Sequence, residues 1–258
     1  MTRHVLIVAG SDSSGGAGIA RDVETVCAFE LRSCLAITAV TVQTHGTVER
    51  IEQMPPELIA AQMRAAFAAN RVAAVKVGMM GTAAAIEAVG AVLASNRQVP
   101  VVLDPVLAST SGRVLLEDDA IAGLRRDLMP FCRLVTPNLV ELARLNGSAP
   151  APDEETALLQ GEELARSVKA AVLVKGGHAR GAQAIDVLLQ PNHPSVRFEA
   201  PRLQRGMRGT GCILSSAIAS SLALGASLEA SVRSAKQYVF EKLRKDAGWI
   251  GLREWRGA

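Results

Sequence analysis

Short apolar segments alternate with amphipathic segments along this chain, and this alternation most constrains its fold. The apolar segments are rich in Val and Leu with little polar alternation, which is typical of strands buried on both faces. Strands are predicted at residues 5–9, 35–43, 74–79, 99–104, 133–136 and 171–175. A βαβα order predicts a mostly parallel central sheet flanked by helices, that is, a three-layer αβα fold of class α/β.

The intervening and later segments complete this architecture. Helices are predicted at residues 57–69, 83–95, 118–129, 154–168, 211–223 and 228–245. Two apolar runs around Pro191 and Pro194, at residues 185–190 and 197–203, predict a hairpin-like antiparallel extension. The chain shows no linker or internal repeat, and the Pro-Ala-Pro-Asp stretch at 150–153 is interpreted as a loop. We therefore expect one domain spanning residues 1–258.

Composition argues against several classes of function. Twenty-eight basic and 25 acidic residues give a net charge of +3, and eight aromatic residues offer little for base stacking, so nucleic-acid binding is not expected. No stretch approaches the roughly 18–20 apolar residues that cross a bilayer. The cysteines at 27, 34, 132 and 212 are scattered, which indicates a reducing compartment and no zinc site. A cytoplasmic protein without a membrane partner is the expectation.

Glycines and polar residues gather where the predicted strands end. They occur at residues 10–18, 43, 78–81, 104–105, 136–138 and 175–178. Ligands of open parallel sheets bind outside the carboxyl ends of the strands. This pattern indicates a binding edge, although ordinary turns account for some of these residues.

The Gly-Thr-Gly-Cys turn at residues 209–212 is the strongest candidate for a phosphate site. Gly209 and Gly211 allow a sharp turn with exposed amides, and the helix that follows Thr210 directs free N–H groups and a positive dipole end at the ligand. Cys212 at this helix start is expected to have a lowered pKa and to act as a thiolate base. Arg208 adds a cation. A glycine-rich helix entry with a buried cysteine is the alternative interpretation.

Other charged and amide side chains suit a phosphate-transfer site. Asn138 and Glu141 are three residues apart at a predicted helix start and can face one point. Together with Asp104 they offer the oxygen ligands that Mg²⁺ prefers. Lys175 and Lys236 can neutralise phosphate charge. The alternatives are a helix-dipole partner for Glu141 and a solvated helix face for Lys236.

Several motifs together resemble one family. They are AGSDSSGGAGI at 9–19 with Asp22, TAVTVQ at 38–43, VKVGMM at 75–80, VLDPV at 102–106, TPNLVE at 136–141, VLVKGGH at 172–178, and GTGC at 209–212 with LSSAI at 214–218. This combination resembles hydroxymethylpyrimidine/phosphomethylpyrimidine kinase, the thiamin-pathway member of the ribokinase-like superfamily. The resemblance covers residues 5 to 240.

The resemblance implies two successive ATP- and magnesium-dependent phosphorylations. The first converts 4-amino-5-hydroxymethyl-2-methylpyrimidine to its monophosphate, and the second makes the diphosphate. By matching position, the pyrimidine would contact Gln43, Asp22, Gly10, Ala17 and Met79. The magnesium and phosphates would lie near Asn138, Glu141 and Asp104, with Lys175 toward ATP, Lys236 near the transferred phosphates, and Cys212 in the position of the superfamily's catalytic base.

Some segments depart from the family pattern, and some alternatives stay open. No glycine precedes the second strand at residues 29–34, the segment at 107–112 is loosely similar, and Met207-Arg208 stands where the family often has Thr-His. A pyridoxal or pyridoxine kinase of the same superfamily and a non-catalytic ligand sensor are the competing interpretations, and a thiol-redox protein is a weaker one. The strands near 185–203 and the resemblance suggest a homodimer, and the glycines within 176–181 would permit a flap.

Overall fold

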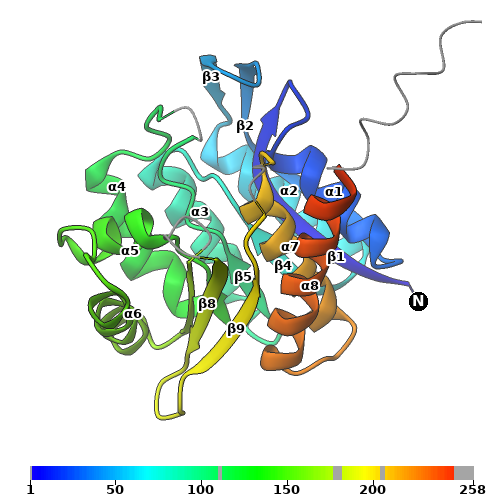
Figure 1. The fold of residues 1–258 in the computed structure, drawn as a ribbon. Coiled ribbons are helices and arrows are strands. Elements are labelled where there is room, and N and C mark those ends of the chain that lie inside the picture. Colours follow the sequence, from blue (N-terminus) through cyan, green and yellow to red (C-terminus); the bar gives the residue numbers. More distant parts are fainter. Residues whose placement is uncertain (1, 110–111, 177–181, 204–206, 247–258) are drawn as a thin grey trace, which may run out of the picture.

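A single nine-stranded sheet organises the protein, as seen in a computed structural model that describes residues 2–109, 112–176, 182–203 and 207–246 (Figure 1). The strand order is β3-β2-β1-β4-β5-β6-β7-β8-β9. The strands are β1 Arg3–Asp12, β2 Arg32–Gln43, β3 Val48–Gln53, β4 Arg71–Val77, β5 Val101–Leu103, β6 Leu134–Val135, β7 Ala171–Lys175, β8 Gln183–Leu189 and β9 Val196–Pro201. The pairs from β2 through β7 are parallel, and β2–β3, β7–β8 and β8–β9 are antiparallel.

Helices cover both faces of this sheet. They are α1 Gly18–Ala28, α2 Pro56–Ala69, α3 Ala83–Ala94, α4 Asp118–Gly123, α5 Leu139–Asn146, α6 Glu154–Val168, α7 Thr210–Ala223 and α8 Leu228–Asp246, with a π turn at Leu124–Leu128 and a 3-10 turn at Met129–Phe131. The predicted α/β class with a mostly parallel, helix-flanked sheet is confirmed.

The core divides into two apolar layers, one on each face of the sheet. Strand β1 shows why, because its successive side chains point to opposite faces. Leu6 and Val8 pack into the layer under α2 to α6, whereas Val5, Ile7 and Ala9 pack into the layer under α1, α7 and α8. All five residues are almost completely buried, as expected for a strand covered on both sides.

Three parts of the chain differ from the prediction. Strand β3 was not predicted, because its sequence VERIEQ is polar and mostly exposed and only its pairing with β2 makes it a strand. Helix α1 was not predicted either, since its start lies in the glycine-rich loop. The single helix predicted at 118–129 is instead α4, a π turn and a 3-10 turn. The predicted hairpin is confirmed as β8 and β9.

The parallel register brings the strand ends together at one edge of the sheet. The amide of Asp104 after β5 donates to the carbonyl of Val77 at the end of β4, and Thr136 after β6 donates to Leu103 at the end of β5. Lys175 at the end of β7 donates to Pro137 in the same way. Residues far apart in the sequence therefore become neighbours at this edge.

Close packing between α3 and the π turn leads to a stability prediction. A Cβ at Gly90 would overlap the carbonyl oxygen of Asp127, which is backbone and cannot move aside cheaply. Gly90→Ala should therefore destabilise the protein by about 1–3 kcal/mol in urea unfolding, although alanine favours helix. Gly123→Ala is the matched control, because its Cβ would lie 3.7 Å from an Asp127 side-chain oxygen, an ordinary contact. Equal stability of Gly90→Ala and the wild type would contradict this packing.

Candidate active site

The Gly-Thr-Gly-Cys turn forms the start of α7, as predicted. Gly209 adopts φ +75°, and a Cβ there would lie 2.6 Å from the carbonyl oxygen of Gly16 and 3.2 Å from Cα of Ala17. Glycine is therefore required, both for its backbone angle and for its contact with the loop after β1. The amides that follow, from Thr210 on, lack partners in the helix and make this end suitable for an anion.

An acidic and basic cluster lies directly beside this helix start. Lys175 Nζ is 2.8 Å from Asp104 Oδ1 and 3.8 Å from Glu141 Oε2. A Cβ at Gly211 would lie 3.2 Å from Asp104 Oδ2 and 3.3 Å from Lys175 Nζ. The structure thus brings together the ends of β5 and β7 and the first turn of α7. The most distant of these residues, Asp104 and Gly211, are more than 100 positions apart in the sequence.

Asn138 and Glu141 form a capping box at the start of α5. Asn138 Oδ1 accepts from the amides of Val140 and Glu141, each at 2.9 Å, and Glu141 Oε2 accepts from the Asn138 amide at 2.7 Å. Burial raises the pKa of Glu141 to about 7, Lys175 opposes this rise, and Asp104 adds to it. Glu141 therefore stabilises the start of α5, as in the alternative interpretation of this residue. It also faces the cluster of Asp104 and Lys175.

The donor set suits Mg²⁺ held partly by phosphates and water. Glu141 Oε1 and Asp104 Oδ2 make no hydrogen bond with the described residues, so each carboxylate keeps one oxygen available. The described part of the chain contains no group of three or more His, Cys, Asp or Glu side chains that could hold a metal by itself. Mg²⁺ commonly binds through one or two carboxylates together with substrate phosphates, so the two residues fit that ion.

Lys236 is held at the same edge and does not lie on a solvated face. Its Nζ is 2.7 Å from Asp186 Oδ2, and its side chain is only 12% exposed. Asp186 Oδ1 accepts from the amide of Gly176, the residue after Lys175. The alternative of a solvated face for Lys236 is therefore wrong. The Asp186 side chain links Lys236 to the backbone at the end of β7.

Asp22, which was predicted to line the pyrimidine site, is held by other protein groups in this structure. Asp22 is completely buried, and its two oxygens are occupied by Lys76 Nζ and Ser216 Oγ, each at 2.8 Å. Lys76, itself fully buried, was not recognised from sequence. Its signal was a lysine inside the apolar run AVKVGMM at 74–80, where a charge needs a buried partner.

The predicted lowering of the Cys212 pKa is also wrong. Burial raises the pKa of Cys212 to about 11, Lys76 lowers it, and Asp22 and Asp104 raise it further. The helix start and the nearby lysine do not compensate for removal of the thiolate from water. Cys212 is therefore a neutral thiol at neutral pH, and its role as a base stays a prediction.

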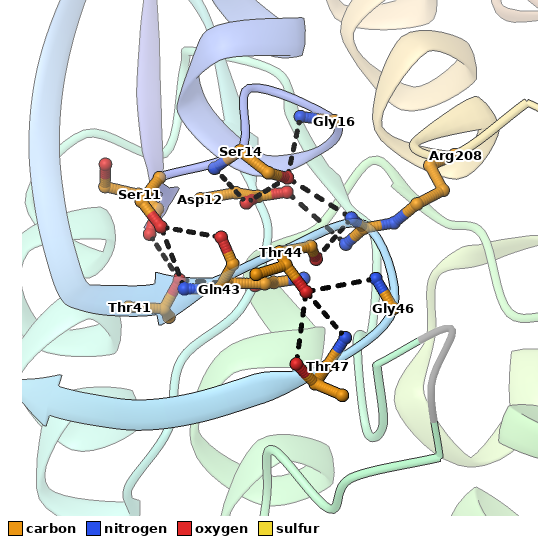
Figure 2. A network of polar contacts seen from close by, with 11 residues as sticks. Ser11, Asp12, Ser14, Gly16, Thr41, Gln43, Thr44, Gly46, Thr47 and Arg208 are labelled. Carbon is orange, nitrogen blue, oxygen red and sulfur yellow. Dashed lines mark hydrogen bonds and ion pairs between the residues drawn. The ribbon is translucent and has the colours of Figure 1, made fainter.

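The predicted pyrimidine-binding residues, apart from Asp22, meet around the loop after β1. A Cβ at Gly10 would lie 3.2 Å from the sulfur of Met79, and a Cβ at Gly209 would lie 3.2 Å from Cα of Ala17. Gln43 ends β2, where its Oε1 accepts from Thr41 and its backbone N–H and C=O both bond Ser13 Oγ at 2.8 Å (Figure 2). The predicted flap glycines at 177 and 181 and the strand-end residue His178 lie outside the described residues.

Proteins of known family match nearly the whole chain. The family model described as phosphomethylpyrimidine kinase matches residues 12–251. A hydroxymethylpyrimidine/phosphomethylpyrimidine kinase of Rhizobium meliloti is 42% identical over 93% of this chain and 90% of its own length. A thiamine biosynthesis bifunctional protein of Geobacter sulfurreducens is 39% identical over 93% of this chain and 49% of its own length.

A solved structure is similar in fold at lower sequence identity. The pyridoxal kinase from Staphylococcus aureus in complex with ADP gives a TM-score of 0.86 at 26% identity, covering 94% of this chain and 88% of that one. Within the described residues, no helix is both long and apolar enough to cross a membrane.

The buried Lys76–Asp22 pair generates a stability prediction. Lys76→Met should lower the free energy of unfolding by about 3–5 kcal/mol, because Asp22 is left buried without its cation. The double variant Lys76→Met/Asp22→Asn should recover most of this loss in urea unfolding, since no unpaired charge remains. A single variant as stable as the double variant would contradict the proposed cost of the unpaired carboxylate.

Proposed function

Because the chain belongs to the phosphomethylpyrimidine kinase family, we propose that it uses ATP to phosphorylate 4-amino-5-hydroxymethyl-2-methylpyrimidine. The monophosphate then accepts a second phosphate to give the diphosphate, in thiamin biosynthesis. The observation that carries this proposal is the position of Gly211, whose Cβ would lie within 3.3 Å of both Asp104 and Lys175. An anion-binding helix start thereby faces a lysine and two carboxylates, the set of groups that phosphoryl transfer needs.

The phosphates are proposed to bind between the start of α7 and the end of β7. The free amides at Thr210 and Gly211 would donate to phosphate oxygens, and such fixed donors are worth about 10²–10³ in rate at comparable sites. Lys175 would be shared between Asp104 and the phosphates of ATP. Lys236, held by Asp186, would add positive charge near the transferred group, and Asn138 fixes the α5 start beside it.

Asp104 and Glu141 are the residues that would hold Mg²⁺. Each keeps a carboxylate oxygen free of hydrogen bonds with described residues, as shown above. When bound, the ion would neutralise charge on the transferred phosphate. The chain's own part is to keep both carboxylates beside Lys175, so that the ion and the Lys175 ammonium would lie close together.

The pyrimidine is proposed to bind at the ends of β1 and β2. The Gln43 amide can both donate to and accept from a pyrimidine ring. Gly10, Ala17 and Met79 would line the pocket around the ring. Asp22 would contribute indirectly, because it pairs with Lys76 and does not touch the substrate.

Cys212 is the proposed base for the substrate hydroxyl in the first step. Because burial raises its pKa to about 11, most of the Cys212 thiol is neutral at pH 7, and the small thiolate fraction would accept the proton of the substrate hydroxyl to form the thiol. In the second step the acceptor is already a phosphate, which needs less help from a base. The two steps should therefore depend on Cys212 to different extents.

A pyridoxal kinase is the second candidate, because the Staphylococcus aureus enzyme shares the fold at a TM-score of 0.86. The pyrimidine kinase is favoured, since the Rhizobium meliloti relative is 42% identical and the pyridoxal kinase only 26%. A non-catalytic sensor would bind both substrates without forming ADP. We further propose that residues 1–258 act as one kinase domain in the cytoplasm, and that the protein forms a homodimer.

Product analysis tests the function directly. Incubation with ATP, Mg²⁺ and the hydroxymethylpyrimidine should give first the monophosphate and then the diphosphate, identified by mass. An ADP-release assay with pyridoxal as the parallel substrate provides the comparison. Turnover of pyridoxal without turnover of the pyrimidine would overturn the assignment, and binding without ADP formation would favour the sensor.

Replacement of Cys212 should separate the two steps. Cys212→Ala is expected to slow the first step by about 10²-fold or more, and the second step much less. In the wild type, the first-step rate should rise with pH between 7 and 9, because the pKa is near 11 and the thiolate fraction grows in that range. The variant should lose this rise. Cys27→Ala, at an exposed cysteine, is the matched control; equal losses in both steps with Cys212→Ala would contradict the role.

A further inference from the structure

Arg208 is a cation next to the Gly-Thr-Gly-Cys turn, and the proposed function gives it no role. Its guanidinium points away from α7 and reaches two other segments (Figure 2). Nη1 donates to Ser14 Oγ at 3.2 Å and to the carbonyl of Thr44 at 2.9 Å, and Nη2 lies 3.4 Å from Asp12 Oδ2. One side chain thus joins the approach to α7, the loop after β1 and the turn after β2.

Asp12 makes this contact a charged one. Its side chain is buried, and its Oδ1 accepts from the amide and hydroxyl of Ser14 at 2.9 and 2.7 Å. Oδ2 is left for Arg208, which is the ion-pair partner of Asp12 among the described residues. A buried carboxylate is costly without a cation, so this pair resists being separated.

The turn at residues 44–47 is a compact unit that Arg208 holds from one side. Thr44 Oγ1 accepts from the amides of Gly46 and Thr47, and the Thr44 amide donates to the Thr47 carbonyl. The Thr44 carbonyl points out of this unit to Arg208 (Figure 2). Because Gln43 immediately precedes Thr44, the position of the Gln43 backbone depends on the hydrogen bond between Arg208 and the Thr44 carbonyl.

A second link places Gln43 against the same loop. Ser13 Oγ bonds both the amide and the carbonyl of Gln43, while Arg208 bonds Asp12 and Ser14 on either side of Ser13. The fit is tight, since a Cβ at Gly16 would lie 3.2 Å from Arg208 Nη1. The loop and the turn are therefore joined at two neighbouring points.

We propose that Arg208 is a positioning residue for the pyrimidine site, which clasps residues 12–16 to residues 44–47 and so fixes Gln43. This rests on the proposed function, because Gln43 is the residue assigned to the pyrimidine. Arginine suits the task, since its planar fork bonds several oxygens at once, whereas lysine offers a single ammonium.

Hydrogen exchange in the ligand-free protein tests the clasp by itself. In Arg208→Gln, the amides of residues 43–47 should exchange about 5–30-fold faster. This factor is expected when the local structure loses the stabilisation of one or two hydrogen bonds. Arg208→Lys should give a smaller increase. Arg50→Gln is the matched control, because its exposed pair with Glu52 lies on neighbouring β3 and outside the network. Unchanged exchange at 43–47 in Arg208→Gln would overturn the clasp.

Steady-state kinetics test its effect on the substrate. Arg208→Gln should raise KM for the pyrimidine by about 5–30-fold, with kcat and KM for ATP within about twofold of wild type, and Arg208→Lys should partly restore it. An equal rise in KM for ATP, or a fall in kcat alone, would overturn the role in pyrimidine binding. If the wild type itself does not turn over the pyrimidine, the proposed function fails, and the role in substrate binding fails with it. The exchange result still decides separately whether the clasp exists.

Discussion

The parallel register of the strands from β1 to β7 is the constraint on which the site depends. Backbone hydrogen bonds join neighbouring strand ends. The amide of Asp104 donates to Val77, that of Thr136 to Leu103 and that of Lys175 to Pro137. These bonds fix the positions of the residues that follow, because the backbone has no freedom left at those points. The Asp104–Lys175 pair at 2.8 Å follows from this register, and the start of α7 packs directly on it.

Every lysine and arginine discussed at this edge is paired with a carboxylate. Lys175 pairs with Asp104, Lys236 with Asp186, Lys76 with Asp22, and Arg208 with Asp12. Buried charges are tolerated only when they are paired, so this arrangement allows a polar site within a sheet that is apolar on both faces. The pairs also set the geometry, since each joins two elements. Lys175 lies beside the start of α7 and Lys236 is held by Asp186 near the end of β7, whereas Lys76 and Arg208 support the structure around them.

The Cys212 thiol shows how burial changes an expectation drawn from local features. A helix start and a nearby lysine both favour a thiolate, and both are present. Removal of the sulfur from water outweighs them, and Asp22 and Asp104 add negative charge nearby. The thiolate is therefore a minor species at neutral pH, although the local sequence around Cys212 favours it.

The sequence by itself was enough to predict the α/β class, most strands and helices, and the edge at which the motifs gather. The reason is that strand burial and helix periodicity are local patterns, and parallel strands place their ends together by geometry. The turn at residues 209–212 and the acidic residues at 104 and 141 could be placed at this edge for the same reason. Strand β3 could not, because its polar sequence becomes a strand only by pairing with β2. Only the tertiary structure decided that Asp22 is buried against Lys76, that the Cys212 pKa is raised, and that Arg208 reaches Asp12 and Thr44. Burial and long-range pairing depend on which segments meet in space, and no local pattern in the chain records that.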